Sequence, residues 1–152
     1  MEITLKNNIA SAQDQAKQFL HKYFADLKQQ ARYAGENKLL NAMEYSVLNG
    51  GKRFRAILAY WSGKSIGLDN ATCNVIAGAL EMVHAFSLVH DDLPAMDNDD
   101  LRRGKPTCHR KFDEATAILA GDALLSESFD LLSSIYNINS SNIKPQNIIK
   151  AI

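Results

Sequence analysis

Apolar residues along most of the chain recur at steps of three and four, which is the spacing of one face of an α-helix. The first such segment spans residues 12–27, and Ser11 with Asp14 resembles a capping box at its start. A second segment spans residues 38–48 and ends at Asn49-Gly50-Gly51, where glycine permits the left-handed backbone that terminates a helix. The segments show neither strand-type alternation nor an internal repeat. The pattern therefore predicts an all-α fold.

A third helix is expected after the two glycines. Its expected apolar face consists of Phe54, Ile57, Leu58 and Trp61. Lys52, Arg53 and Arg55 crowd its first turn, where cations oppose the helix dipole. A bound anion would favour this arrangement, because it would meet free backbone N–H groups and basic side chains together. So short a motif also fits an ordinary basic helix surface, so both interpretations stay open.

The longest apolar segment spans residues 71–92, after a turn at residues 67–70. Because it is apolar nearly all round, we expect it to form the buried centre of the fold. His84 lies about two turns before Asp91, on nearly the same face of this helix. His84 is therefore either a hydrogen-bonded core residue or part of a site beneath the carboxylates that follow.

An acidic stretch follows the central helix directly, and a basic stretch follows the acidic one. The acids are Asp91, Asp92, Asp97, Asp99 and Asp100, and the bases are Arg102, Arg103, Lys105, Arg110 and Lys111. Neighbouring carboxylates repel one another unless cations neutralise them. Mg²⁺ is typically held by one or two carboxylates while substrate phosphates supply further oxygens. The sequence therefore predicts a magnesium site with bases placed for phosphates.

Asp91 and Asp97 would point about 120° apart around a straight helix, too far apart for one metal site. Pro94 removes a backbone donor and disfavours helical geometry in the residue before it. We therefore expect the chain to leave the helix between Asp92 and Asp97, which allows Asp97 to return beside Asp91. The polar segment 98–112 is expected to form a loop over this acidic end.

The helical spacing resumes over residues 114–135, with Asp113 as the expected N-cap. The expected apolar face of this helix consists of Ile118, Leu125, Phe129, Leu132 and Tyr136. Residues 137–146 have the composition of a loop, and a new apolar pattern begins at residues 148–152. A chain that stops there is expected to be part of a larger helical domain.

The composition changes this picture little. With 152 residues and 46% apolar side chains, the chain fits one domain with one core. A net charge of zero gives no bulk attraction to nucleic acid or to an anionic membrane. Cys73 and Cys108 lack metal-site spacing, and no signal-peptide pattern or uninterrupted apolar run of about 18 residues occurs in the sequence. We therefore expect a cytoplasmic protein without membrane insertion or a nucleic-acid partner.

Several motifs, in order, resemble those of the trans-isoprenyl diphosphate synthases, specifically the bacterial farnesyl diphosphate synthase type. The matching segments are residues 50–55 (GGKRFR, the first basic motif), 91–97 (DDLPAMD, the first aspartate-rich motif with two extra residues), 98–107 and 117–124. The resemblance covers roughly residues 35–135. It implies an antiparallel helical bundle of the isoprenoid synthase type, with residues 1–152 as the N-terminal half of a single polyprenyl synthase domain.

The resemblance implies a prenyltransferase that condenses isopentenyl diphosphate with dimethylallyl or geranyl diphosphate to give farnesyl diphosphate. Asp91 and Asp97 would hold Mg²⁺. The implied catalytic residues are Asp91, Asp92, Asp97 and Arg102. The implied diphosphate-binding residues are Lys52, Arg55, His84 and Arg103 for isopentenyl diphosphate and Arg102 for the allylic substrate. The resemblance also implies a homodimer.

Phe86 and Ser87, which lie five and four places before Asp91, match the positions that set product length in this family. The aromatic Phe86 resembles short-chain enzymes and implies a fifteen-carbon product. Ala56 departs from the proline that the family usually carries, and the second aspartate-rich motif is absent from the sequence, so we expect this chain by itself to be inactive. A non-catalytic diphosphate-binding or interaction subunit is the alternative. A terpene cyclase would not explain residues 50–55 or the pair Arg102-Arg103.

Overall fold

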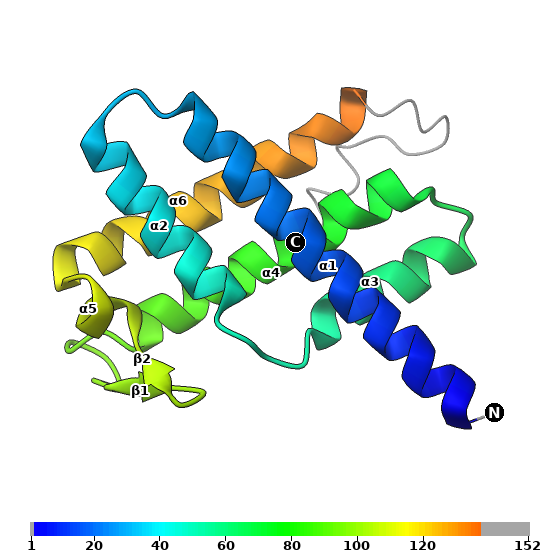
Figure 1. Cartoon of the computed structure of the whole chain (residues 1–152), viewed down its shortest axis with the longest axis horizontal. Coiled ribbons are helices and arrows are strands. Elements are labelled where there is room, and N and C mark those ends of the chain that lie inside the picture. Colours follow the sequence, from blue (N-terminus) through cyan, green and yellow to red (C-terminus); the bar gives the residue numbers. More distant parts are fainter. Residues whose placement is uncertain (1, 138–152) are drawn as a thin grey trace.

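The computed structural model describes residues 2–137, and the predictions for residues 138–152 lie outside this range. The helices are α1 (Glu2–Gln30), α2 (Ala34–Leu48), α3 (Phe54–Ser65), α4 (Asn70–Asp91), α5 (Cys108–Lys111) and α6 (Glu114–Ser133), followed by a 3₁₀ turn at Ser134–Asn137. The strands β1 (Leu101–Arg102) and β2 (Lys105–Pro106) form a short hairpin at one end of the helices (Figure 1). The predicted all-α class is confirmed.

The first two helices follow the predicted spacing but not all of the predicted ends. Because α1 begins at Glu2, Ser11 lies inside the helix, and the capping box predicted there is wrong. The three-four spacing does identify the buried side of α1, which consists of Ala12, Ala16, Leu20 and Phe24. Helix α2 ends at Leu48 as predicted, and Gly50 has the left-handed φ of 82° expected after a helix.

Helix α4 lies at the centre of the fold and contacts α1, α3 and α6 (Figure 1). Asp69 caps its N-terminus by accepting a hydrogen bond from the Thr72 backbone N–H (2.7 Å). Among the described residues, α4 has the length and the mean hydropathy, 1.4, of a membrane-crossing helix, as core helices of soluble proteins also do. Its burial by the neighbouring helices confirms the predicted central position.

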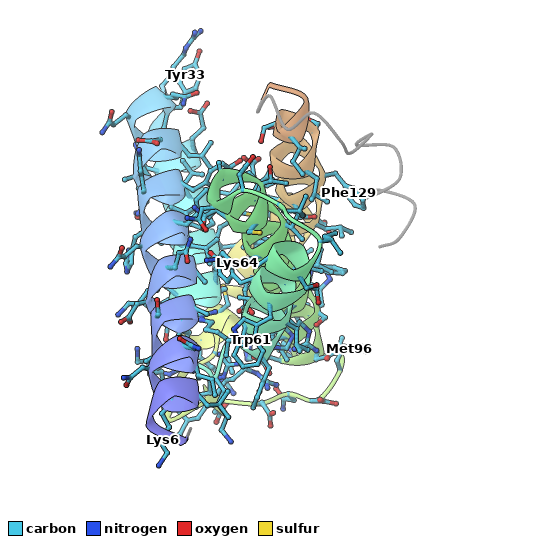
Figure 2. All side chains as sticks on the ribbon, turned by 90° about the vertical axis from the view of Figure 1, so that its right-hand side faces the viewer. Lys6, Tyr33, Trp61, Lys64, Met96 and Phe129 are labelled. Carbon is cyan, nitrogen blue, oxygen red and sulfur yellow. The ribbon has the colours of Figure 1, made fainter. Side chains whose placement is uncertain are left out.

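The buried face of helix α6 combines small side chains with leucines. Its buried positions are Thr116, Ala117, Ala120, Gly121, Leu124, Ser128, Leu131 and Leu132. Ile118 and Phe129, from the predicted apolar face, are about 40% exposed, and Phe129 projects from the side of the molecule away from α1 (Figure 2). The predicted face is therefore wrong in part, because small residues allow the close approach of α6 to α4. The predicted N-cap is confirmed, since the Asp113 carboxylate accepts a hydrogen bond from the Thr116 N–H (2.7 Å).

The face predicted for helix α3 is also wrong in part. Phe54 and Leu58 are exposed, whereas Ile57 and Tyr60 are buried. The Tyr60 hydroxyl donates a hydrogen bond to the side chain of Asn74 on α4 (2.7 Å). Helix α3 therefore packs against α1 and α4 through Ile57 and Tyr60, and its side with Phe54 and Leu58 faces outward.

The segment predicted as a loop over residues 98–112 contains both the hairpin and α5. Leu101 pairs with Pro106 and Arg102 with Lys105, and the turn between the strands places Arg103 and Gly104 at φ values of 55° and 77°. The hairpin thereby extends Arg102 and Arg103 from adjacent positions at the C-terminal end of α4.

Candidate functional site

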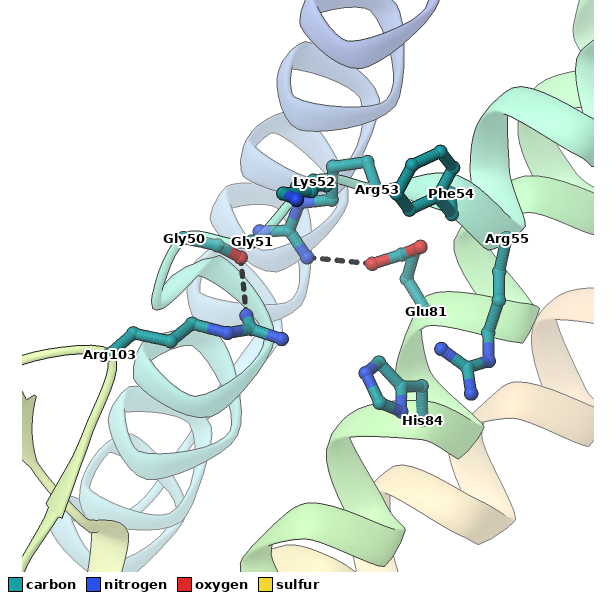
Figure 3. Close-up of a pocket in the computed structure, with 9 residues that line it drawn as sticks. All are labelled: Gly50, Gly51, Lys52, Arg53, Phe54, Arg55, Glu81, His84 and Arg103. Atoms are coloured by element: carbon teal, nitrogen blue, oxygen red, sulfur yellow. Dashed lines mark hydrogen bonds and ion pairs between the residues drawn. The ribbon is translucent and has the colours of Figure 1, made fainter.

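A cavity of about 560 Å³ opens between the loop that follows α2, the start of α3 and the middle of α4 (Figure 3). We call it the basic pocket. It is lined by Gly50, Gly51, Lys52, Arg53, Phe54, Arg55, Glu81, His84 and Arg103. Four of these residues are cationic and one is a carboxylate, so the lining is strongly positive.

The basic pocket contains all four residues expected to bind isopentenyl diphosphate. Lys52 comes from the loop, Arg55 from the first turn of α3, His84 from α4 and Arg103 from the hairpin turn. Figure 3 shows the guanidinium of Arg55 beside the His84 ring and that of Arg103 beneath the glycine loop. The fold thus gathers on one cavity side chains that are up to 51 positions apart in the sequence.

Arg103 is fixed against the glycine loop. Its Nη1 donates a hydrogen bond to the Gly50 carbonyl oxygen (2.6 Å). A Cβ atom on residue 51 would lie only 2.5 Å from the same nitrogen, and Gly51 has a φ of 102°. Glycine at this position therefore serves two needs, because it allows the left-handed backbone and leaves space for the guanidinium.

A buried ion pair in the basic pocket was not predicted from the sequence. Arg53 Nη1 donates to Glu81 Oε2 (2.7 Å), and the two side chains are only 9% and 3% exposed. The other carboxylate oxygen, Oε1, accepts a hydrogen bond from the Ala56 backbone N–H (3.3 Å). The available signal was that Glu81 is a charged residue inside the otherwise apolar helix α4.

His84 forms part of the pocket wall rather than a hydrogen-bonded site in the core. Its pKa is lowered from the ordinary value of 6.5, first because burial penalises the charged ring and then because Arg55 lies close. The imidazole is therefore neutral at pH 7 in the unliganded chain. An anion in the pocket would offset the repulsion from Arg55 and favour the protonated ring.

The residues from Asp91 to Asp97, which we call the acidic end, leave the helix as predicted. Helix α4 ends at Asp91, and the Asp97 backbone N–H donates to the Asp91 carbonyl oxygen (2.8 Å). The backbone of residue 97 thus returns beside that of residue 91, and both side chains are exposed.

Asp92 differs from its two exposed neighbours. It is only 3% exposed, and Arg102 Nε donates to both of its carboxylate oxygens (2.8 Å each). The Nη2 atom of Arg102 also donates to Asp92 and lies 3.8 Å from the carboxylate of Asp99. In this structure Asp92 therefore holds Arg102 at the acidic end and does not face solvent.

The comparison with known protein families decides the family. The family model described as polyprenyl synthetase matches residues 36–151, about three quarters of the chain. The chain belongs to the polyprenyl synthetase family.

Known members of the family are similar over most of this chain. The farnesyl diphosphate synthases of Haemophilus influenzae and Escherichia coli are 57% identical over 101 residues and 50% identical over 119 residues. These alignments cover 66% and 78% of this chain but 34% and 38% of the relatives. The chain therefore spans about a third of the length of these curated relatives.

Solved structures agree with this assignment. The geranyltransferase from Legionella pneumophila superposes with a TM-score of 0.77 at 42% identity, covering 84% of this chain and 43% of that one. An FPP/GFPP synthase from Zymomonas mobilis superposes with a TM-score of 0.76 at 39% identity, covering 88% and 46%. The helical arrangement is thus that of the isoprenoid synthases, as the motifs implied.

The acidic end of this polyprenyl synthetase family member offers donors that suit Mg²⁺. Among residues 2–137, no three His, Cys, Asp or Glu side chains gather into a complete metal-binding cluster. Asp91 and Asp97 nevertheless provide exposed hard oxygen donors on either side of Asp92, which holds Arg102. Because Mg²⁺ usually takes one or two carboxylates together with water and phosphate oxygens, this donor set fits the ion. The metal-binding role of the two residues stays a prediction.

The two residues matched to product length lie on α4 outside the basic pocket. The Phe86 ring packs edge-on against the His90 ring, with 4.9 Å between the centroids. His90 occupies a notch on α6, since a Cβ atom on Gly121 would lie 2.1 Å from its Nε2. Ser87 Oγ donates to the His84 carbonyl oxygen of the same helix (2.9 Å).

Proposed function

We propose that the chain carries the isopentenyl diphosphate site, and part of the allylic diphosphate site, of a prenyltransferase that forms farnesyl diphosphate. The basic pocket is the observation that carries this proposal. Lys52, Arg55 and Arg103 converge there beside His84. A diphosphate is the ligand for which such a set of cations is suited, because guanidinium groups donate pairs of hydrogen bonds to phosphate oxygens.

The basic pocket and the acidic end bind different substrates in this proposal. The basic pocket holds isopentenyl diphosphate, and Arg102 at the acidic end binds the allylic diphosphate. Asp91 and Asp97 would hold Mg²⁺, which would neutralise the charge that develops on the leaving diphosphate. The C–O bond of the allylic substrate then breaks, the double bond of isopentenyl diphosphate attacks the allylic carbon, and a proton is lost.

Phe86 on α4 suggests the length of the product. The allylic tail would extend from the acidic end along α4 toward Phe86, whose ring is supported by His90. An aromatic ring there limits the depth of the tail-binding space, which supports a fifteen-carbon product. The named relatives, which are synthases and transferases, do not favour the non-catalytic alternative.

We also propose a cytoplasmic homodimer. The free thiols Cys73 and Cys108 are both buried, which suits a reducing compartment. The outer side of α6 exposes Ile118, Leu119 and Phe129, which offers an apolar surface for a second copy.

Calorimetric titration of isopentenyl diphosphate into the 152-residue chain without Mg²⁺ tests the pocket. Replacing Lys52, Arg55 and Arg103 together with alanine should weaken binding at least 100-fold, since each charge-assisted hydrogen bond contributes about 1.5–3 kcal/mol. The matched control replaces the exposed lysines 17, 22 and 64, which removes the same net charge elsewhere. Equal affinities of the two triple variants, or no binding by the parent chain, would refute the proposal.

Turnover tests the acidic end. In an active protein that contains this sequence, Asp91→Ala should abolish formation of farnesyl diphosphate while leaving the fold intact, because the exposed carboxylate has little structural role. Product extraction after incubation with both substrates and Mg²⁺ measures the effect. Activity within tenfold of the parent would refute the metal-binding role.

A further inference from the structure

We propose that Glu81 and Arg53 act as positioning residues for the basic pocket, and that Glu81 replaces the missing N-cap of α3. This inference rests on the proposed function, because the ligand of the positioned side chains is the diphosphate group of isopentenyl diphosphate. Both side chains are buried in the wall of the pocket, and neither is among the residues that the resemblance implies for diphosphate binding.

The start of α3 has no cap of its own. The N-cap residue, Arg53, has a left-handed φ of 53°, and its side chain makes no capping hydrogen bond. Glu81 reaches across from α4 and accepts the Ala56 N–H, which is the position that an ordinary N-cap side chain would serve. A carboxylate at this place also interacts favourably with the helix dipole. The crowding of cations at the start of α3 is thus balanced by an anion that belongs to the protein.

Glu81 also fixes the conformation of Arg53. A non-glycine residue with positive φ is costly unless neighbouring contacts maintain it. The 2.7 Å ion pair between Arg53 and Glu81 supplies such a contact inside the protein. Arg53 stands directly between Lys52 and the first turn that carries Arg55, so the direction of both side chains depends on its backbone.

The pair leaves a defined charge for the ligand. With Arg53 neutralised by Glu81, the remaining cations of the pocket are Lys52, Arg55 and Arg103. A diphosphate ester carries about two to three negative charges near pH 7, since each phosphate contributes one or more. The three cations therefore match the ligand without help from Arg53.

An explanation by net charge and an explanation by side-chain positioning predict opposite changes in diphosphate affinity for Glu81→Gln. This change adds one net positive charge to the pocket, so attraction by charge would make diphosphate binding tighter. If Glu81 positions Arg53 and the first turn of α3, binding should instead become weaker. The sign of the change in affinity therefore separates the two explanations.

The test is calorimetric titration of isopentenyl diphosphate, and of inorganic pyrophosphate, into the 152-residue chain and its variants. We expect Glu81→Gln to weaken binding at least tenfold. The double variant Arg53→Gln with Glu81→Gln should bind within threefold of the parent, because two amides can pair with each other and the amide oxygen introduced at position 81 can still accept the Ala56 N–H. Glu44→Gln is the matched control, since Glu44 pairs with Lys28 away from the pocket, and its affinity should equal that of the parent.

Thermal unfolding of each variant separates misfolding from misplacement. If Glu81→Gln does not fold, Glu81→Asp carries the test, because it keeps the charge and only shortens the side chain, so the explanation by positioning predicts weaker binding and the explanation by net charge predicts no change. Equal or tighter binding by Glu81→Gln, or a double variant as weak as the single one, would overturn the inference. Absence of diphosphate binding in the parent chain would instead overturn the proposed function.

Discussion

The basic pocket and the acidic end lie at two places along α4, and they differ in how their charges are held. In the basic pocket Arg53 is tied to Glu81 and Arg103 to the Gly50 carbonyl. At the acidic end Asp91 and Asp97 are exposed, while the buried Asp92 is committed to Arg102. Arg53 and Arg103 are thus held before any ligand arrives, whereas two of the carboxylates still face water.

The difference follows from the partners each region requires. Side chains that are already ordered lose less conformational entropy when a ligand binds, so a preformed pocket gains affinity. Exposed carboxylates keep their hydration until a cation replaces it. The basic pocket is therefore expected to bind a diphosphate by its own residues, and the acidic end to need a metal ion.

The largest expected effect is a difference in the free energy of unfolding between variants of two adjacent residues of the acidic end. Asp92→Ala leaves Arg102 without its buried partner and should lower the free energy of unfolding by about 3 kcal/mol. Asp91→Ala removes an exposed carboxylate and should change it by no more than about 0.5 kcal/mol. Urea denaturation of both variants measures the contrast. If the two variants unfolded at the same urea concentration, Asp92 would not have the structural role assigned to it.

The dependence on Mg²⁺ should differ between the two regions. Binding of isopentenyl diphosphate is expected to be the same with Mg²⁺ or with a chelator. Binding of geranyl diphosphate should weaken at least tenfold with the chelator, and the double variant Asp91→Ala with Asp97→Ala should lose this response. Parallel titrations measure both ligands. A Mg²⁺ requirement for isopentenyl diphosphate would contradict the division proposed between the two regions.

Gly51→Ala should weaken isopentenyl diphosphate binding about tenfold, because the added Cβ would occupy the place of the Arg103 guanidinium. Gly67→Ala is the control, since Gly67 also has a positive φ, 82°, but has nothing within 4 Å of an added Cβ. Both variants carry a similar backbone cost of about 1–2 kcal/mol. Calorimetry and thermal unfolding should show a loss of stability in both variants and a loss of affinity in Gly51→Ala only.

The smallest expected effect concerns pH. The pKa of His84 in the folded chain lies below 6.5, so the unfolded chain binds more protons as the pH falls below that value. The free energy of unfolding should therefore decrease with falling pH in this range, and His84→Asn should reduce the slope. Urea denaturation from pH 7.5 to pH 5 measures it, and identical slopes would contradict the placement of His84. Saturating pyrophosphate should flatten the slope of the parent, since an anion favours the charged ring.

The sequence predicted the order of the helices, because the spacing that favours a helix is a short-range pattern. The spacing of Ala12, Ala16 and Leu20 located the buried side of α1, and Pro94 correctly indicated the end of α4. These features act within a few residues along the chain. Local chemistry was therefore sufficient to predict them.

Features that depend on contacts between helices were missed. The helical spacing placed Ile118 and Phe129 on the predicted apolar face of α6, yet Ala120 and Gly121 lie in the buried interface because close approach requires small residues. The Glu81 carboxylate gained its role from Arg53, 28 positions earlier, and spacing gives no sign of such a pair. The short hairpin was missed because two-residue strands carry no alternation.

The β1–β2 hairpin connects the acidic end and the basic pocket through two consecutive residues. Arg102 extends to Asp92 at the acidic end, and the next residue, Arg103, extends to the glycine loop of the basic pocket. Their Cα atoms are separated by one peptide unit, about 3.8 Å, which cannot stretch. A movement of the backbone at one arginine is therefore passed to the other, so the hairpin couples the basic pocket to the acidic end.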